Sequence, residues 1–405
     1  MNARSRTSLF LHADGDSFFV ECELSKRPEL RGKPVIVGGD KGIAVAMSRE
    51  AKKLGVHRGM PVFKIKKLYP EVIILEHTFS LYREISNKMY EIMISYMEEV
   101  EEYSIDECFA IVRHSDLVYF GGPQKLLEEI RNDIWRTLGV SYSFGIARTK
   151  ALAKVASKLE KPGGVVALLS EEDEHDALRR TSIEDVWGIG FRTRTRFKNM
   201  GLQSAYDFIQ LADDEIERHF SSTHLSLKHE LAGHSLYAVH ADTDPRDQKS
   251  IQSTETFRPA SSDRNVIWAE IAKNVEGACE NARDLQLLSN TVSFFVKTSE
   301  FTYRFDQVKL TLFSADPGFM LNELEEKFLE LLVPGEKIRS TGAILHNLRR
   351  VDDVPRDLFG VQQASIKRLA VEEAADKIRE KYGHSSIRRA ASLKTERHNR
   401  DTSFH

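Results

Sequence analysis

Three absences limit the class of protein. Cysteine occurs only at positions 22, 108 and 279, and no two of these have the spacing of a zinc or disulfide pair. No apolar run is long enough to span a bilayer, and the first residues lead into a strand and not into a signal-peptide core. The net charge of −3 argues neither for nor against a polyanionic partner. We therefore expect a cytoplasmic protein in a reducing compartment, with no membrane partner.

The composition is that of a globular protein, with 41% hydrophobic and 29% charged residues. A length of 405 residues predicts roughly two to four domains, each with its own core. Strands and helices alternate up to about residue 169, which predicts an α/β layer. From 250 to 350 the pattern is strand, helix, strand, strand, helix, strand, which predicts a βαββαβ domain.

The stretch 103–111 holds two adjacent carboxylates, Asp106 and Glu107, directly before an apolar run at 108–112 that predicts a buried strand. Apolar residues recur at helical spacing over 81–100, so we expect a helix, a short connection and then the strand. Adjacent strand residues point to opposite faces, so a bend is needed to aim both carboxylates at one ion. On the dipeptide alone, a solvated turn with two charges is the more frequent interpretation.

A second acidic strand strengthens the hypothesis that these carboxylates form a metal site. Residues 8–14 predict a buried strand, and His12, Asp14 and Asp16 would share one of its faces. An HxDxD metal cluster is therefore one hypothesis for this strand. It leads to a metal-dependent phosphohydrolase as an alternative function, although the 14 histidines show no further motif of that class.

A helix predicted at 48–54 carries positive charge near its start. Ser48 is well placed as its N-cap, and Arg49 and Lys52 lie three residues apart on one face. These cations either face solvent or clamp a triphosphate.

Further along the chain, Gly188 and Gly190 precede a basic helix, an arrangement that suits a DNA phosphate but also suits tight packing. The cations of that helix that we expect at DNA are Arg192, Arg194 and Lys198.

Five motifs in order resemble a Y-family (translesion) DNA polymerase of the DinB/Pol IV branch, with some UmuC-like features, from residue 10 to about 350. Each motif alone is moderately specific, and the five in this order are very hard to obtain by chance. They are Asp14-Gly15-Asp16-Ser17-Phe18-Phe19, Glu50-Ala51-Lys52-Lys53-Leu54-Gly55, Ser104-Ile105-Asp106-Glu107, Phe144-Gly145-Ile146-Ala147 and Lys161-Pro162-Gly163-Gly164.

The resemblance implies an α+β multidomain fold shaped as a right hand. It would have a ferredoxin-like palm, small fingers, a helical thumb with a helix-hairpin-helix element, and a little finger with the βαββαβ pattern. The implied ranges are 1–17 and 80–168 for the palm, 18–79 for the fingers, 169–240 for the thumb, 241–249 for a linker and 250–350 for the little finger. The tail, 351–405, would hold one helix at about 365–382 and a polar, basic end that we expect to be partly disordered.

The resemblance also implies the chemistry. Nucleotidyl transfer uses two divalent ions about 3.5–4 Å apart, and hard cations prefer carboxylate oxygens. Asp14 and Asp106 would bridge two Mg²⁺ ions, with Mn²⁺ as an alternative, and Glu107 would hold the ion that activates the primer hydroxyl. The Gly15 carbonyl would add a ligand. The family uses no counterpart of Asp16 as a ligand.

The other two polar residues of the strand that carries Asp14 are not expected to bind an ion. We read Asp16 as a structural residue or an outer partner of the site, and His12 as a packed strand residue. Asp14, Asp106 and Glu107 are all present, which argues against a catalytically inactive DNA-binding scaffold as the alternative.

The incoming nucleotide would contact residues from several motifs. Phe19 matches the aromatic position that excludes a 2′-hydroxyl, a steric gate, whereas its neighbour Phe18 reads as a core residue. Lys161 matches a lysine on the triphosphate. The full expected set is Ser17, Phe18, Phe19, Ser48, Arg49, Lys52 and Lys161. Arg49 and Lys52 stand where a tyrosine and an arginine are usual, and Lys52 cannot make a bidentate phosphate contact. Ala46 replaces a usual threonine.

The implied partners are primer–template DNA, deoxynucleotides and a sliding clamp, with the protein a monomer. Cations on or near strands of the little finger would track the DNA backbone, adding salt-sensitive affinity. These are Arg258, Lys297, Arg304, Lys309 and Arg339. Leu358 and Phe359 resemble the end of a clamp-binding peptide, although Pro355 stands where a glutamine is usual, and a solvated linker helix is the alternative for the tail.

Overall fold

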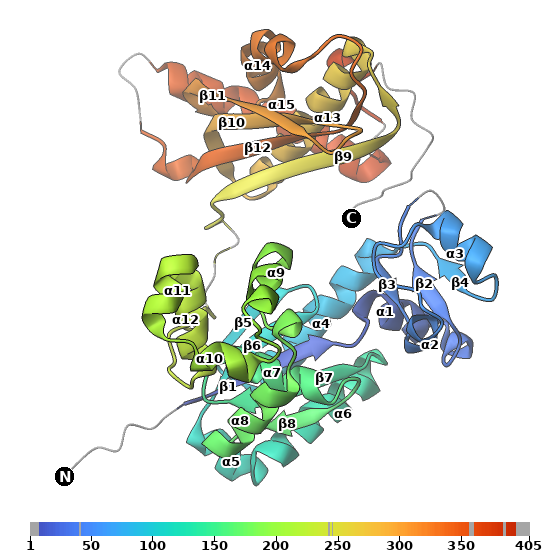
Figure 1. Ribbon diagram of the computed structural model, residues 1–405. Coiled ribbons are helices and arrows are strands. Elements are labelled where there is room, and N and C mark those ends of the chain that lie inside the picture. The colour runs from blue at the N-terminus through green and yellow to red at the C-terminus, as the bar shows by residue number, and fades with distance from the viewer. Residues whose placement is uncertain are drawn as a thin grey trace. The chain divides into compact units, whose positions relative to one another are not determined.

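The computed structural model describes residues 8–39, 42–241, 244, 246–355, 360–383 and 386–393. The chain divides into two compact units, Met1–Thr243 and Asp244–His405 (Figure 1). Within the described residues, no helix is both long and apolar enough to cross a membrane.

The first unit is built on a five-stranded sheet with the order β5-β6-β1-β7-β8. The central strand β1 (Leu9–Gly15) is antiparallel to both β6 (Glu107–Val112) and β7 (Tyr142–Ala147). The edge strands are β5 (Val100–Ser104), antiparallel to β6, and β8 (Val165–Ala167), parallel to β7. This arrangement places the two acidic motifs on neighbouring strands.

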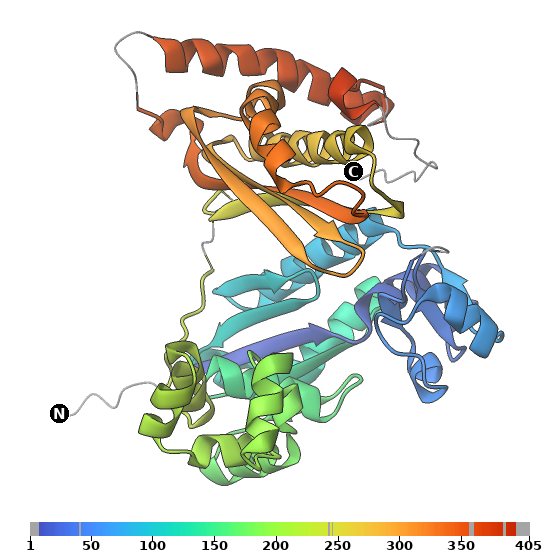
Figure 2. The same cartoon turned by 45° about the horizontal axis from the view of Figure 1, so that its top comes forward.

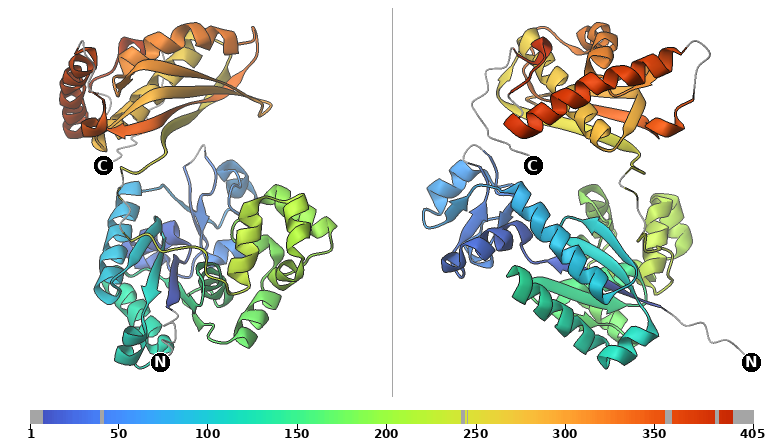
Figure 3. Two further views of the ribbon diagram at one scale, coloured as in Figure 1. Left: turned by 90° about the vertical axis from the view of Figure 1, so that its left-hand side faces the viewer. Right: turned by 180° about the vertical axis from the view of Figure 1, so that it is seen from behind.

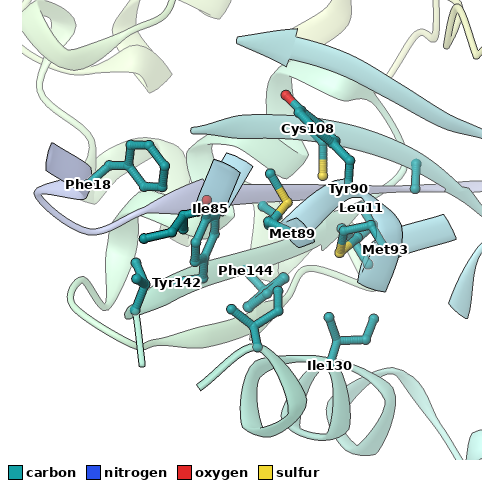
Figure 4. Packing of buried hydrophobic residues seen from close by; sticks show 14 of the residues in the cluster. Leu11, Phe18, Ile85, Met89, Tyr90, Met93, Cys108, Ile130, Tyr142 and Phe144 are labelled. Atoms are coloured by element: carbon teal, nitrogen blue, oxygen red, sulfur yellow. The ribbon is translucent and has the colours of Figure 1, made fainter. Parts of the chain in front are cut away.

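Helices cover both faces of this sheet. Leu11 on β1 packs in the core made with α4 (Phe79–Tyr96) and α6 (Pro123–Leu138), and Figure 4 shows it among Met93, Phe144 and other members of this core. Phe10, next along the strand, packs in the core that α7 (Lys150–Leu159) shares. The alternation follows because successive strand residues point to opposite faces.

A smaller sheet follows β1 in the chain, with the order β3-β2-β4 and its own core. Its elements are β2 (Val35–Val37), β3 (Ala46–Met47), α2 (Arg49–Lys53), α3 (Val62–Leu68) and β4 (Ile73–Leu75). The preceding helix α1 (Phe18–Lys26) packs in the core of the large sheet instead, through residues such as Val20. The short element η1 (Pro28–Leu30) follows α1, and α5 (His114–Phe120) follows β6 and packs against the core of the large sheet.

A group of short helices follows β8, and its apolar residues share a core with α7. These elements are α8 (Glu171–Arg180), η2 (Ile183–Asp185), α9 (Phe191–Asn199), α10 (Ala205–Gln210), α11 (Asp213–His219) and α12 (Ser222–Leu231). The helical segment expected at 169–240 is therefore present. The division into palm, fingers and thumb stays a prediction.

The second unit has the predicted order of strands and helices, folded as an antiparallel sheet with the order β11-β10-β12-β9 (Figure 2). Its core lies between one face of the sheet and the helices. The elements are β9 (Ser250–Ser261), α13 (Arg264–Asp284), β10 (Leu287–Thr298), β11 (Tyr303–Ser314), α14 (Pro317–Leu331) and β12 (Ile338–Arg350).

The tail helix, α15 (Val361–Tyr382), is part of the second unit and not a solvated linker helix, so that alternative is wrong (Figure 3). Leu369 is buried in the core of this unit, and Asp376 makes a bidentate ion pair with Arg283 of α13. Arg379 donates to the Ile387 carbonyl, which fastens the segment after the helix. Two short elements flank α15, η3 (Val351–Asp353) and η4 (Ala390–Ser392). Residues 394–405 lie outside the described residues.

One local expectation needs correction. The helix expected over 81–100 ends at Tyr96, and the unpredicted strand β5 follows, because Val100 pairs with Ala110 of β6. Long-range pairing decides the conformation at this place.

The ion pair between α13 and α15 gives a stability prediction. The Arg283 side chain is 3% exposed, so Asp376→Asn leaves a buried guanidinium without its carboxylate. We expect the free energy of unfolding of the second unit to fall by about 3–5 kcal/mol, measured by urea denaturation of the full chain. Glu330→Gln, which breaks an exposed pair with Lys327, is the matched control and should have no measurable effect. A loss below about 1 kcal/mol would mean that α15 is not held by this pair.

Candidate active site

The acidic residues of the first unit come together where β1 and β6 meet. Asp14 is the register partner of Glu107 across the two strands. The Gly15 amide donates to the Asp106 carbonyl at 2.9 Å. Asp106 lies in the turn between β5 and β6, so the bend that the acid pair needs is the tip of a hairpin.

Each of the three carboxylates has a partner. Lys161 Nζ lies 2.5 Å from Asp14 Oδ1, and Lys154 Nζ lies 2.6 Å from Glu107 Oε2. The Ser104 hydroxyl donates to Asp106 Oδ1 at 2.7 Å. Burial raises the pKa of Asp14, an effect that the positive charge of Lys161 opposes. The acids are thus balanced by lysines within the fold.

The donor set fits a hard divalent cation, because carboxylates and a backbone carbonyl are the oxygen ligands that such ions prefer. Among the described residues, however, no three His, Cys, Asp or Glu side chains are arranged to hold a metal ion together. Two of the three acids are directed at lysines. Residues able to hold an ion are therefore Asp14, Asp106 and Glu107, with the Gly15 carbonyl, once the contact of Lys161 with Asp14 gives way.

Asp16 and His12 have structural roles, as predicted. Asp16 accepts hydrogen bonds from the Ser141 and Ser143 hydroxyls and from the Gly163 amide. His12 is buried, and its Nδ1 lies 2.7 Å from the Ser157 hydroxyl. Burial lowers the pKa of His12 well below its usual value. The strand does not present an HxDxD metal cluster.

The two phenylalanines at the start of α1 occupy different environments. Phe19 is half-buried and stacks on Tyr82, with ring centroids 4.4 Å apart and planes 12° apart. Phe79 contacts its edge at 6.0 Å. Phe18 is buried in the core against Tyr142, so its ring is not available to a nucleotide, and the expected contact of this residue stays a prediction for its backbone alone. Phe18 was expected from the residue pattern to be a core residue, and burial bears this out.

The structure brings Lys52 and Ser17 together from separate elements. Lys52 Nζ donates to the Ser17 hydroxyl at 3.3 Å, and Ser17 has a left-handed φ of 49° that turns the chain from β1 into α1. Arg49 is exposed on α2. The Ser48 hydroxyl is buried, caps α2 by accepting from the Ala51 amide, and is thereby committed to the fold.

The glycine loop before α9 has the predicted form, but its cations are less free than expected. Gly188 has a φ of +82°, and Gly190 is the N-cap of α9. Arg194 and Lys198 both pair with Glu184. Arg192 is exposed. No local pattern indicates the shared carboxylate, because Glu184 lies ten residues before Arg194 and reaches it only through the turn.

In the second unit, side chains alternate between the two faces of the sheet, so the expected DNA contacts do not all lie on one face. Lys297 on β10 donates to the Tyr303 hydroxyl, and Lys309 is exposed on the same face of β11. Arg304 points to the opposite face, donates to the Leu331 carbonyl and pairs with Glu336, so its expected role at DNA is wrong.

The other predicted cations of this unit keep exposed or half-exposed positions. Arg258 is exposed on β9, and Arg339 lies 4.4 Å from the centroid of the Phe301 ring. Leu358 and Phe359, the expected clamp contacts, lie outside the described residues.

Sequence reasoning missed the lysines of α7. Lys150 pairs with Glu101 and Lys154 with Glu107, and both side chains are less than 10% exposed. A signal was available, because Lys150, Lys154 and Lys158 recur every fourth residue and therefore lie on one helix face. Nothing in the sequence indicated that this face is turned toward the acidic strands.

Comparison with known proteins identifies the family. The impB/mucB/samB family model matches residues 13–158, and the model of the C-terminal domain of that family matches residues 248–358. A DNA polymerase IV of Desulfatibacillum aliphaticivorans is 30% identical over 393 residues, covering 95% of this chain and 96% of that protein. A DNA polymerase IV of Streptococcus pyogenes serotype M1 is 29% identical over 355 residues, covering 86% of this chain and 96% of that protein.

Solved structures agree in fold. A Y-family DNA polymerase chimera built on Dbh has a TM-score of 0.72 at 21% identity, and DinB from Sulfolobus solfataricus has a TM-score of 0.54 at 21% identity. Each comparison covers 84% of this chain and 99% of the other. The predicted fold class is therefore confirmed. The chain belongs to the impB/mucB/samB family, the Y-family of DNA polymerases.

Proposed function

We propose that the protein is a template-directed DNA polymerase that adds deoxynucleotides to a primer 3′ end across damaged template bases. The observation that carries the proposal is the meeting of Asp14, Asp106 and Glu107 at one end of β1 and β6, in a chain whose relatives are named DNA polymerase IV.

Two divalent ions, when bound there, supply the Lewis-acid charge that nucleotidyl transfer needs at the attacking oxygen and the triphosphate. Asp14 and Asp106 would hold both ions, and Glu107 with the Gly15 carbonyl would complete the ligands. Mg²⁺ fits this all-oxygen donor set, and Mn²⁺ fits it also.

Lys161 is placed to respond to a change in the charge at Asp14. Its side chain is 30% exposed and is tied to Asp14, so it neutralises that carboxylate before ions arrive. With the ions in place, Lys161 would be released to the triphosphate, since the carboxylate charge is then compensated. Lys52, whose ammonium reaches the Ser17 hydroxyl, would add a second cation for the phosphates.

Low fidelity and lesion bypass fit the small sheet of residues 35–75. Its core is a separate cluster of few buried residues, and fingers of this size would leave an open site that accommodates a damaged template base. DNA contacts would come from Arg192 beside the glycine loop, and from Lys297 and Lys309 on the exposed sheet face, giving salt-sensitive affinity. A phosphohydrolase built on His12 and Asp16 is not favoured, because both side chains are engaged within the fold.

The first experiment is primer extension on an undamaged primer–template with Mg²⁺ and four deoxynucleotides. Asp106→Asn removes a bridging charge while keeping the side-chain shape, so we expect at least a 100-fold loss of rate, of the order found when one group that stabilises the transition state is lost. Glu102→Gln, on the adjacent strand of the same hairpin, is the control and should extend as wild type does. DNA binding without any extension by wild type would favour an inactive scaffold instead.

Phe19 provides a test of sugar selection. Its ring is fixed by stacking on Tyr82, so Phe19→Ala should open space for a 2′-hydroxyl and raise ribonucleotide incorporation by about tenfold or more. The measurement is the ratio of kcat/KM for deoxynucleotide and ribonucleotide. Phe63→Ala, which removes an exposed ring on α3, is the control. An unchanged ratio in Phe19→Ala would remove the steric-gate assignment.

Clamp binding is best tested by substitution. A deletion from residue 357 would also remove α15, whose Leu369 is part of the core of the second unit. The double variant Leu358→Ala/Phe359→Ala should keep basal extension and lose stimulation by a sliding clamp. Val371→Ala, an exposed apolar position on α15, should keep both. Stimulation that persists in the double variant would show that these residues do not bind the clamp.

A further inference from the structure

An ammonium group lies inside a cluster of aromatic rings beside the acidic site. Lys154 is 6% exposed, and its Nζ pairs with Glu107 at 2.6 Å. The same nitrogen lies 4.7 Å from the ring centroid of Tyr103, 5.4 Å from that of Trp187 and 5.9 Å from that of Phe109. Ring faces attract a cation most strongly where water is excluded. Lys154 is therefore held by one carboxylate and three rings.

The contact with Lys154 uses one oxygen of Glu107. Oε2 accepts the hydrogen bond, and Oε1 has no hydrogen-bond partner among the described residues. A carboxylate can ligate an ion through one oxygen while the other accepts a hydrogen bond that fixes its orientation. Lys161 is less confined than Lys154, because its side chain is 30% exposed and that of Lys154 is 7% exposed. Lys161 can move to a substrate, whereas Lys154 is confined.

We propose that Lys154 is a positioning residue for Glu107, and that Trp187 links this contact to the glycine loop before α9. The pair holds the Glu107 carboxylate in one orientation, with Oε1 left for a divalent ion. This inference rests on the proposed function, because it gives Glu107 an ion to hold.

The link through Trp187 is direct. Trp187 precedes Gly188 in the loop, and its Nε1 donates to the Tyr103 hydroxyl at 3.2 Å. The two rings meet edge to face, with centroids 5.7 Å apart and planes at 87°. A phosphate bound at the glycine loop would therefore act on a residue that touches both Lys154 and Tyr103. Coupling of this kind is reciprocal, so DNA at the loop and an ion at Glu107 would each change the affinity for the other by the same factor.

A matched pair of variants separates positioning from stability. Lys154→Met and Lys150→Met each remove one buried ammonium from α7, but Lys150 pairs with Glu101 at 2.7 Å and not with Glu107. Lys154→Met should raise the Mg²⁺ concentration for half-maximal primer extension by about tenfold or more, whereas Lys150→Met should leave it within about twofold of wild type. Trp187→Leu should raise it by a smaller factor. Thermal unfolding of each variant monitors loss of folded protein.

A second readout does not depend on activity. The chain has three tryptophans, so Trp135→Phe/Trp268→Phe leaves Trp187 as the sole indole emitter. Mg²⁺ is titrated into this protein bound to a dideoxy-terminated primer–template and the matching deoxynucleotide. The ion compensates the charge of Glu107 and so leaves the charge of the nearby Lys154 ammonium less neutralised, which changes the electric field at the indole. We expect a Mg²⁺-dependent change in emission that Lys154→Met abolishes and Lys150→Met retains.

Equal Mg²⁺ midpoints for the two methionine variants, or an emission titration unaltered by Lys154→Met, would overturn the proposal. Failure of the proposed function gives a different pattern. If wild type extends no primer while the Lys154-dependent emission change is present, the polymerase activity is wrong and the positioning role stands.

Discussion

Burial of neighbouring carboxylates is the constraint on which the acidic site of the first unit depends. Asp14 and Glu107 face each other across paired strands, and Asp106 is fixed to the same strand end by its carbonyl. Burial, with the negative charge of Glu107 as a smaller contribution, raises the pKa of Asp14, and Lys161 opposes this rise. Crowded acids can remain ionised in a fold only where cations compensate them. Two lysines from outside the acidic strands perform this function.

Helix α7 carries the lysine that compensates the charge of Glu107. Its residues contribute to the core shared with the helices after β8, and its lysines reach the acidic strands β5 and β6. The helix lies close to β7 because Gly145 has no side chain. A Cβ at that position would lie 2.2 Å from the Ala153 carbonyl oxygen and 2.4 Å from the Ser157 amide. The glycine in the Phe144-Gly145-Ile146-Ala147 motif therefore serves the packing that brings Lys154 to Glu107.

The two faces of the sheet in the second unit carry different kinds of side chain. One face is covered by α13 and α14, while the other presents aromatic and cationic side chains such as Tyr303 and Lys297. Gly342 gives room on that open face, since a Cβ there would lie 2.3 Å from the Phe295 ring. Buried pairs such as Arg283 with Asp376 join α15 to the helical layer. Among the described residues of the second unit, the helices pack on the opposite face of the sheet.

The sequence alone determined the strands over 8–14 and 108–112, the helices near 48–54 and 365–382, the βαββαβ order and the family. Those features follow from periodicity and from motifs whose residues are close in the chain. Only the tertiary structure decided which lysines neutralise the acids, that Arg304 faces the helices, and that the Phe19 ring stacks on Tyr82. It also decided that residues 100–104 form a strand. These outcomes depend on contacts between distant segments, whose register and facing no local pattern encodes.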